Sequence, residues 1–328
     1  MATTLTIPRA RDILLSRDML LRSGYTDRRL RSHVADGSIV RLRRDRYALT
    51  ADLANLWPEG RHLIDVVATH LNGRGSDPVF WGPSAAVLHG IPLYRLRPNN
   101  VHVVVLGSRH ARTKAAVVQH DVLLPEGDIT RIDGIRCTSL DRTILDLACT
   151  ATWEATVAAA DAALRRECVT GHDHDERRAE QWHLRMSDRA RQSRLHGIRH
   201  ARRLIAFADG RAQLPGESVS RLHLHRLGFR NVMLQVPITG AEGDHYWLDF
   251  GFPGSQVFGE FDGQTKYLDE DLRGGRTLEQ ALLDEKRRED DVRGVTGWRF
   301  ARWEERHIRT ADALGQRLAA FGVHPQAG

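Results

Sequence analysis

Signals that begin and end helices are crowded into the first forty residues of this 328-residue chain. Ser16 and Thr26 are residue types that cap the start of a helix with a side-chain oxygen. Gly24 and Gly37 are placed to end helices, because glycine adopts the left-handed conformation found at helix C-termini. The apolar residues between these signals predict three short helices, which must pack against one another and against the next segment of the chain to be stable.

Two short apolar segments come after the third helix. Residues 39–42 and 47–49 have the β-branched and aromatic character of strands, and the charged turn at 43–45 lies between them. Three short helices followed by a hairpin predict a winged helix-turn-helix domain over residues 1–50. In such a domain the third helix enters the major groove of DNA, and the hairpin, or wing, offers further contacts.

The distribution of charge supports a DNA partner. The net charge is +6, and residues 1–50 hold 11 Arg and 5 acidic residues, so the rest of the chain is balanced. Arginine suits phosphates and guanine edges because its planar guanidinium forms paired hydrogen bonds. The alternative is that these arginines form an ordinary solvated surface. The chain has only three Lys, so it uses arginine for nearly all of its basic positions. The residues expected to face DNA lie on the third helix and the wing: Arg28, Arg29, Arg31, Ser32, His33, Arg41, Arg43, Arg44 and Arg46.

Composition excludes several classes of protein. Hydrophobic residues make up 41% of the chain and charged residues 27%, as in ordinary globular domains. No apolar run approaches the roughly 18 residues of a membrane helix. The three cysteines are widely spaced and form no CxxC pair, which argues against a disulfide framework or a zinc site. We therefore expect an α/β multidomain protein of the cytoplasm that does not contact membranes.

The middle of the chain predicts a mixed α/β domain over residues 51–165 and a helical connector over residues 166–210. Asp133-Gly134 between two apolar segments predicts a type I′ hairpin turn. The His-Asp-His-Asp segment at 172–175 has the composition of a metal site but lies in a polar helical stretch, which favours a surface role. Three other histidines adjoin apolar residues and are expected to be packed groups rather than ligands: His89, His102 and His120.

In residues 211–320 carboxylates lie within otherwise apolar strands. The strand expected at 256–262 places Glu260 and Asp262 on one face by its alternation. Asp249 lies on the preceding strand, which a short turn would pair with this one. Carboxylates this close repel one another unless a cation lies among them, and Mg²⁺ is the expected cation.

Two lysines extend this set. Lys266 follows the strand, and a lysine kept in an arginine-rich chain suggests a place for a compact ammonium group. Carboxylates, Mg²⁺ and a nearby lysine are the minimal apparatus for phosphodiester hydrolysis. The helix expected at 277–293 carries Lys286 and the like-charge pair Glu285 and Glu289. Stabilising ion pairs along the helix are the simpler explanation of this run, but the like-charge pair suggests that Lys266 or a phosphate-bound metal faces the helix.

The first half of the chain resembles a known family. The N-terminal helices and wing, with the segments at 84–93, 101–103 and 142–148, are similar to the antitoxin component of abortive-infection type IV toxin–antitoxin systems. The resemblance implies that the winged helix binds operator DNA. It also implies a second partner, a nucleotidyltransferase-like toxin that the antitoxin neutralises.

Residues 215–308 resemble the PD-(D/E)XK nuclease superfamily, in the branch similar to very-short-patch-repair endonucleases. The resemblance implies that Asp249 and Glu260 bind Mg²⁺ with Glu217 in support. Asp262 stands where the superfamily usually has lysine, so Lys266 or Lys286 would take that role. The catalytic residues implied in this way are Glu217, Asp249, Glu260, Asp262, Lys266 and Lys286.

These patterns lead to two candidate functions. The leading hypothesis is a DNA-binding protein whose endonuclease-like C-terminal domain hydrolyses DNA phosphodiesters with Mg²⁺. The alternative is a non-catalytic transcriptional regulator or antitoxin in which the nuclease domain is degenerate.

Overall fold

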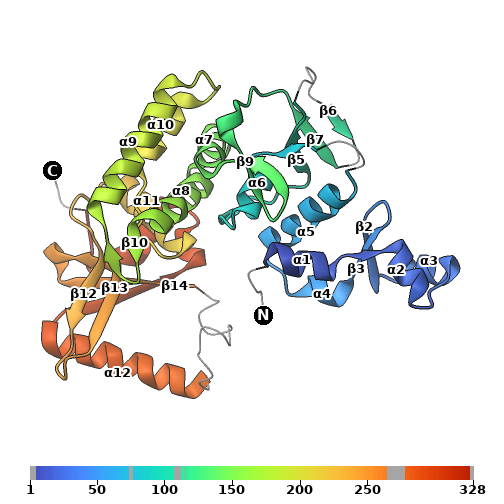
Figure 1. Cartoon of the computed structure of the whole chain (residues 1–328). Coiled ribbons are helices and arrows are strands. Elements are labelled where there is room, and N and C mark those ends of the chain that lie inside the picture. The colour runs from blue at the N-terminus through green and yellow to red at the C-terminus, as the bar shows by residue number, and fades with distance from the viewer. Residues whose placement is uncertain (1–4, 74–76, 107–111, 115, 264–277, 326–328) are drawn as a thin grey trace. The chain divides into compact units, whose positions relative to one another are not determined.

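The computed structural model describes residues 5–73, 77–106, 112–114, 116–263 and 278–325. It is an α/β structure that divides into two compact units (Figure 1). The first unit comprises Met1–Ala151 and Leu195–Gly197, and the second comprises Thr152–Arg194 and Ile198–Gly328. The α/β class with more than one unit agrees with the sequence, while the division falls before the boundary expected at residue 165. The reason is that helix α8 (Trp153–Cys168) packs against the C-terminal helices.

The first unit begins with short helices and a small antiparallel sheet of order β1-β3-β2. The Ser16 and Thr26 side chains cap helices by accepting hydrogen bonds from the backbone N–H groups of Met19 and Arg29, as the sequence predicts. The elements are α1 (Ile7–Ile13), β1 (Leu15–Ser16), α2 (Arg17–Arg22), α3 (Asp27–Ala35), β2 (Ile39–Arg43) and β3 (Arg46–Leu49). Leu20, Leu30, Ile39 and Tyr47 form their shared core.

A mixed sheet of order β6-β7-β5-β4-β9-β8 forms the rest of the first unit. Asp133 and Gly134 both have positive φ and connect β8 to β9 in two residues, so the predicted hairpin turn is confirmed. The strands are β4 (Val79–Phe80), β5 (Val101–Val104), β6 (Arg112–Lys114), β7 (Val117–His120), β8 (Ile129–Ile132) and β9 (Ile135–Thr138). The helices are α4 (Thr50–Ala54), α5 (Pro58–Leu71), α6 (Pro83–Leu88), η1 (Glu126–Asp128) and α7 (Leu140–Thr150).

A buried ion-pair network fixes α7 in this unit. Nη1 of Arg142 lies 2.8 Å from Oδ2 of Asp128, and its Nε lies 2.9 Å from Oδ1 of Asp146. Burial raises the pKa of Asp146 to about 7, although the adjacent guanidinium acts in the opposite direction. These residues therefore have a structural role in the core.

The second unit contains a sheet of order β12-β13-β14-β15, in which only the β14–β15 pair is parallel among the described strands. Helix α12 (Leu278–Thr296) connects this parallel pair in the chain. The strands are β12 (Met233–Thr239), β13 (His245–Phe252), β14 (Val257–Asp262) and β15 (Arg299–Glu304). The other elements are β10 (Val169–Thr170), β11 (Asp173–His174), α9 (Glu176–Gln192), α10 (Ile198–Phe207), α11 (Pro215–Arg226), η2 (Pro253–Ser255), η3 (Glu305–Ile308) and α13 (Ala311–Ala319).

Helices α11 and α12 pack against this sheet (Figure 1). Helix α12 contributes Val292 to a core cluster with Val236, Leu248, Phe258 and Phe300. Helix α11 packs so closely on the sheet that a Cβ atom at its Gly216 would lie 2.1 Å from Cε1 of Phe261. On the same helix the Ser220 hydroxyl accepts a hydrogen bond of 2.8 Å from the indole N–H of Trp303.

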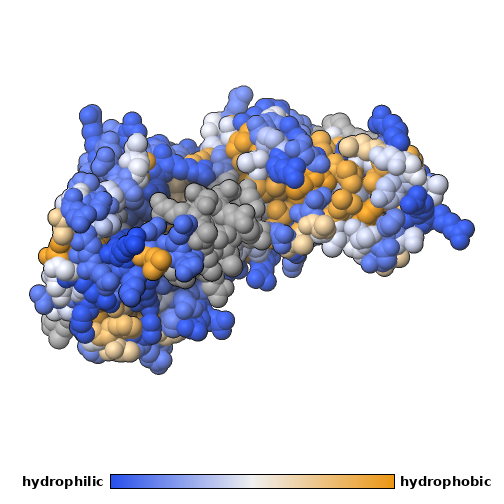
Figure 2. All heavy atoms as spheres, turned by 90° about the horizontal axis from the view of Figure 1, so that it is seen from below, coloured by the Kyte–Doolittle hydropathy of each residue, from blue (hydrophilic) through white to orange (hydrophobic). Residues whose placement is uncertain are grey.

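Apolar side chains are unevenly distributed over the face of the molecule that Figure 2 draws. Figure 2 shows hydrophobic residues gathered over the first unit on the face in view, whereas the second unit presents mostly hydrophilic residues there. Within the described ranges, no helix combines the length and the apolar character that crossing a lipid bilayer requires.

Two glycines test the packing of the second unit. We expect Gly216→Ala to lower its free energy of unfolding by about 1–3 kcal/mol, because the added methyl group overlaps the Phe261 ring. Gly294→Ala in α12 is the matched control, because its Cβ would meet open space. The better helix propensity of alanine should raise its free energy of unfolding by about 0.5–1 kcal/mol. Urea unfolding monitored by circular dichroism measures both, and equal stability of the two variants would contradict the close packing of α11.

Candidate functional site

Three of the carboxylates singled out in the sequence come together around the middle strands of the second unit. Glu217 lies in the first turn of α11, Asp249 on β13 and Glu260 on β14. The side-chain amide of Gln235 donates to Oε2 of Glu217 at 3.3 Å and to Oδ1 of Asp249 at 3.5 Å. The backbone N–H of Phe261, the neighbour of Glu260, donates to Oδ2 of Asp249 at 2.9 Å.

Gln235 joins this group from β12, where it lies opposite Asp249 of β13. Leu234 pairs with Phe250 and Val236 pairs with Leu248, whereas Gln235, between them, has a φ of 48°. Such a left-handed conformation is uncommon for a residue with a side chain. It accompanies the placement of the Gln235 amide beside Glu217 and Asp249.

Glu260 is bound by arginines. Its carboxylate contacts Nη2 of Arg288 on α12 and lies 3.1 Å from Nη2 of Arg302 on β15. Glu260 is only 5% exposed, and burial raises its pKa while the two guanidiniums oppose that shift. Guanidinium–carboxylate pairs of this kind are among the stronger ion pairs in proteins.

Arg302 also explains the like-charge pair on α12. Its Nη2 lies 2.6 Å from Oε1 of Glu285 and 3.0 Å from Oε2 of Glu289. The cation facing these two carboxylates is therefore an arginine of the neighbouring strand. The parallel pairing of β14 and β15, with Glu260 opposite Arg302, is the signal that sequence reasoning missed.

Of the other residues singled out in the second unit, the structure describes two. Asp262 is partly buried at the end of β14, opposite Glu304 on β15. Lys286 is exposed on α12, and Lys266 lies outside the described residues.

The carboxylates as they lie do not suit Mg²⁺. Among the described residues, no group of three or more His, Cys, Asp or Glu side chains is arranged to hold a metal ion. The physical reason is that Glu260 already has two guanidinium partners, while Asp249 and Glu217 accept hydrogen bonds from protein donors. The positive charge that the acids require is supplied by Arg288 and Arg302.

The arginine-bearing surface of the first unit lies on α3 and the hairpin. Arg28, Arg29, Arg31, Ser32, Arg41 and Arg44 are exposed. A groove of about 310 Å³ lies between the helix and the sheet and is lined in part by Arg31 and Arg41. Neither of these two has an ion-pair partner within the part of the chain that the structure describes.

The remaining three residues expected to face DNA have partners inside the unit. Nε of Arg43 donates to the Thr69 hydroxyl at 3.1 Å, and Nε of Arg46 donates to Oδ1 of Asn72 at 3.1 Å. Nδ1 of His33 lies 2.9 Å from the Ser38 hydroxyl oxygen. Arg43 and Arg46 therefore attach the hairpin to the end of α5.

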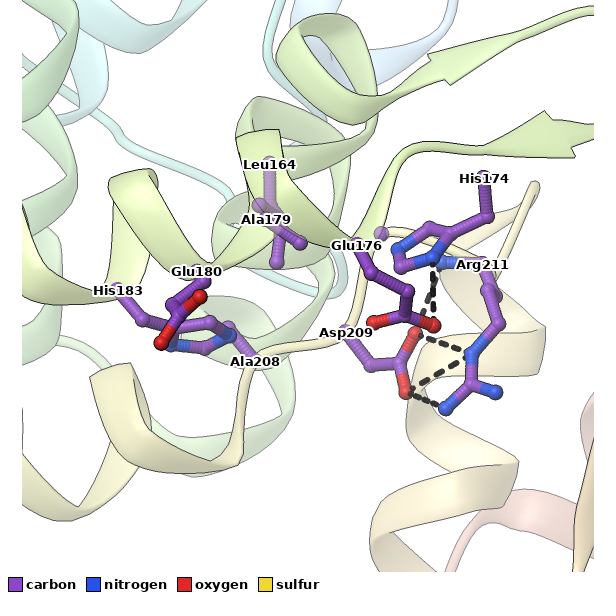
Figure 3. A pocket seen from close by; sticks show the side chains of 10 residues that line it. Leu164, His174, Glu176, Ala179, Glu180, His183, Ala208, Asp209 and Arg211 are labelled. Atoms are coloured by element: carbon purple, nitrogen blue, oxygen red, sulfur yellow. Dashed lines mark hydrogen bonds and ion pairs between the residues drawn. The ribbon is translucent and has the colours of Figure 1, made fainter.

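A second hollow, of about 290 Å³, lies in the second unit beside the His-Asp-His-Asp segment (Figure 3). The Asp209 carboxylate pairs with the Arg211 guanidinium at 2.7 Å, and Nδ1 of His174 lies 3.1 Å from Oε1 of Glu176. Figure 3 shows Glu180 and His183 together at the other end of the hollow. The polar groups at one end thus pair with one another.

The three histidines of the first unit that were expected to be packed have partners within it. Nδ1 of His102 lies 2.8 Å from Nε2 of His120, and Nε2 of His89 lies 2.8 Å from the carbonyl oxygen of Thr138. Burial lowers the pKa of His102 to about 4. This histidine is therefore neutral at physiological pH.

Comparisons with known proteins give relatives without an assigned function. No protein-family profile matches the chain. Two uncharacterized proteins of Mycobacterium tuberculosis, one from strain CDC 1551 / Oshkosh and one from strain ATCC 25618 / H37Rv, are each 33% identical to it over 132 residues. The match covers 38% of this chain and 48% of each relative, so the chain spans about half the length of the curated relatives it matches.

Replacing Arg302 tests whether it holds the acidic group together. We expect Arg302→Met to lower the free energy of unfolding by about 3 kcal/mol, because Glu260 and two further carboxylates lose a shared partner. Adding Glu260→Gln should restore part of the loss. Arg306→Met, at an exposed pair with Glu304, is the control and should change stability by less than about 1 kcal/mol. Urea unfolding measures all three, and an Arg302→Met protein as stable as the control would contradict this assignment.

Proposed function

We propose that this chain is a DNA-binding regulator of the cytoplasm that attaches to duplex DNA through a winged helix-turn-helix in its first unit. The observation that carries the proposal is the set of exposed arginines on α3 and β2, with Arg31 and Arg41 lining one groove. Exposed guanidiniums on a short helix and an adjacent hairpin suit the phosphates and base edges of a major groove.

Salt dependence tests this attachment. We expect wild-type affinity for duplex DNA to fall steeply with salt, because neutralised phosphates release counterions. Replacing Arg31 and Arg41 by Gln should lower the slope of log affinity against log salt by about 2. Arg131→Gln, at an exposed pair with Asp77, is the control and should leave the slope unchanged. Fluorescence anisotropy of a labelled duplex measures the slope. Equal slopes for the double variant and wild type would remove this groove from the DNA interface.

The second unit supports a further part of the proposal. The order of α11, three antiparallel strands, α12 and a parallel strand suits a restriction-endonuclease-like domain. Because Arg288 and Arg302 bind Glu260, we propose that this domain is degenerate as a nuclease and acts in regulation. A nucleotidyltransferase-like toxin, implied by the resemblance of the first half, is the protein partner that we propose.

Hydrolysis of DNA is the second candidate function. The observation in its favour is that Glu217, Asp249 and Glu260 come from three different elements: Gln235 donates to the first two, and the backbone N–H next to Glu260 donates to Asp249. Such convergence is typical of catalytic sites. The corresponding activity is Mg²⁺-dependent cleavage of phosphodiesters.

Plasmid cleavage separates the two functions. We expect purified wild-type protein to leave supercoiled plasmid intact in Mg²⁺ or Mn²⁺, because Glu260 is held by Arg288 and Arg302. Nicking by the wild type that Asp249→Asn and Glu260→Gln abolish would establish the nuclease and overturn the regulatory proposal. Nicking that persists in both variants would indicate a contaminating nuclease.

A further inference from the structure

The charge balance after residue 50 conceals a second basic segment. Residues 176–203 contain nine Arg and three acidic residues, a net charge of +6 that equals the excess in residues 1–50. Acidic residues elsewhere offset it, so a sum over the rest of the chain hides it. Most of the segment forms α9 and part of α10, which pack against each other in the second unit, whereas Leu195–Gly197 between them belongs to the first unit.

Three exposed arginines of this segment lie near one end of the α9–α10 pair. Arg202 donates from Nη2 to the carbonyl oxygens of Ala190 and Arg191 at 3.1 and 3.4 Å, which holds the start of α10 beside the end of α9. Arg194, Arg199 and Arg203 are therefore near the same end of the helix pair. All three are exposed, and none has an ion-pair partner in the described ranges.

Helix α10 carries two of these arginines, Arg199 and Arg203, at positions that its local electrostatics disfavour. It contains no acidic residue. Arg199 lies in its first turn, where the helix dipole disfavours a cation, and Arg203 lies four residues later, where like charges repel. Its apolar residues Ala201, Leu204 and Ile205 are buried, so the arginines occupy the opposite, solvent-facing side. An anionic partner would relieve both repulsions.

We propose that the arginines at this end of α9 and α10 form a second DNA-binding surface, in which Arg194, Arg199 and Arg203 bind phosphates of the duplex. This inference rests on the proposed DNA-binding function. A duplex fits better than a protein, because the exposed side of α10 has no large apolar side chain of the kind that a protein interface places at its centre. Phosphate contacts require only charge and hydrogen bonding.

The test compares variants of the full chain by anisotropy with a labelled duplex of about 30 base pairs, over about 50 to 200 mM salt. Arg199→Gln with Arg203→Gln should lower the salt slope by about 2, and each single variant by about 1. Arg306→Gln, an exposed and paired arginine of the same unit, is the control and should leave the slope unchanged. Circular dichroism checks that each variant keeps its helix content.

The outcomes separate the two DNA surfaces. A lower slope in the α10 variants and, separately, in the Arg31 and Arg41 variant supports both surfaces. Wild-type binding with an unchanged slope in the α10 variants would overturn the second surface and leave the proposed function standing. Absence of binding by the wild type would overturn both proposals.

Discussion

The second unit depends on one arginine that binds carboxylates from two elements. Arg302 on β15 contacts Glu260 on β14 and Glu285 and Glu289 on α12, so a single guanidinium joins two strands and the covering helix. Without it, three acidic groups would face one another across a partly buried space, where repulsion is weakly screened. The pairing turns an arrangement that should push α12 away into one that fixes it on the sheet. The negative charge of these three carboxylates is therefore balanced by an arginine of the same chain.

The sequence predicts the local structure well because caps, glycines and alternation act over a few residues. Ser16, Thr26 and the Asp133-Gly134 turn are used as expected. The grouping of Asp249 with Glu260 was also predictable, since it needs only that adjacent strands pair. The role of Arg302 could not be predicted, because it depends on the register between strands separated by a whole helix.

The same distinction between local and distant interactions applies to charge. Counting charges along the chain locates basic segments but cannot tell which cations are already in use. Arg43 is nearly buried against α5, whereas Arg44, its neighbour in the sequence, is exposed. A net charge summed over a long stretch also conceals basic segments such as 176–203, because acidic residues elsewhere in the chain offset their positive charge.

The attachment of the hairpin to α5 has an energetic consequence for binding. Arg43 and Arg46 donate to Thr69 and Asn72, and the Asn72 amide in turn donates to the carbonyl oxygen of Arg44 at 2.7 Å. The turn of the hairpin is thus already ordered when the protein is free. Most of the conformational entropy that a loose loop would lose on meeting a ligand is lost during folding instead. A preorganised turn of this kind allows tighter binding for the same number of contacts.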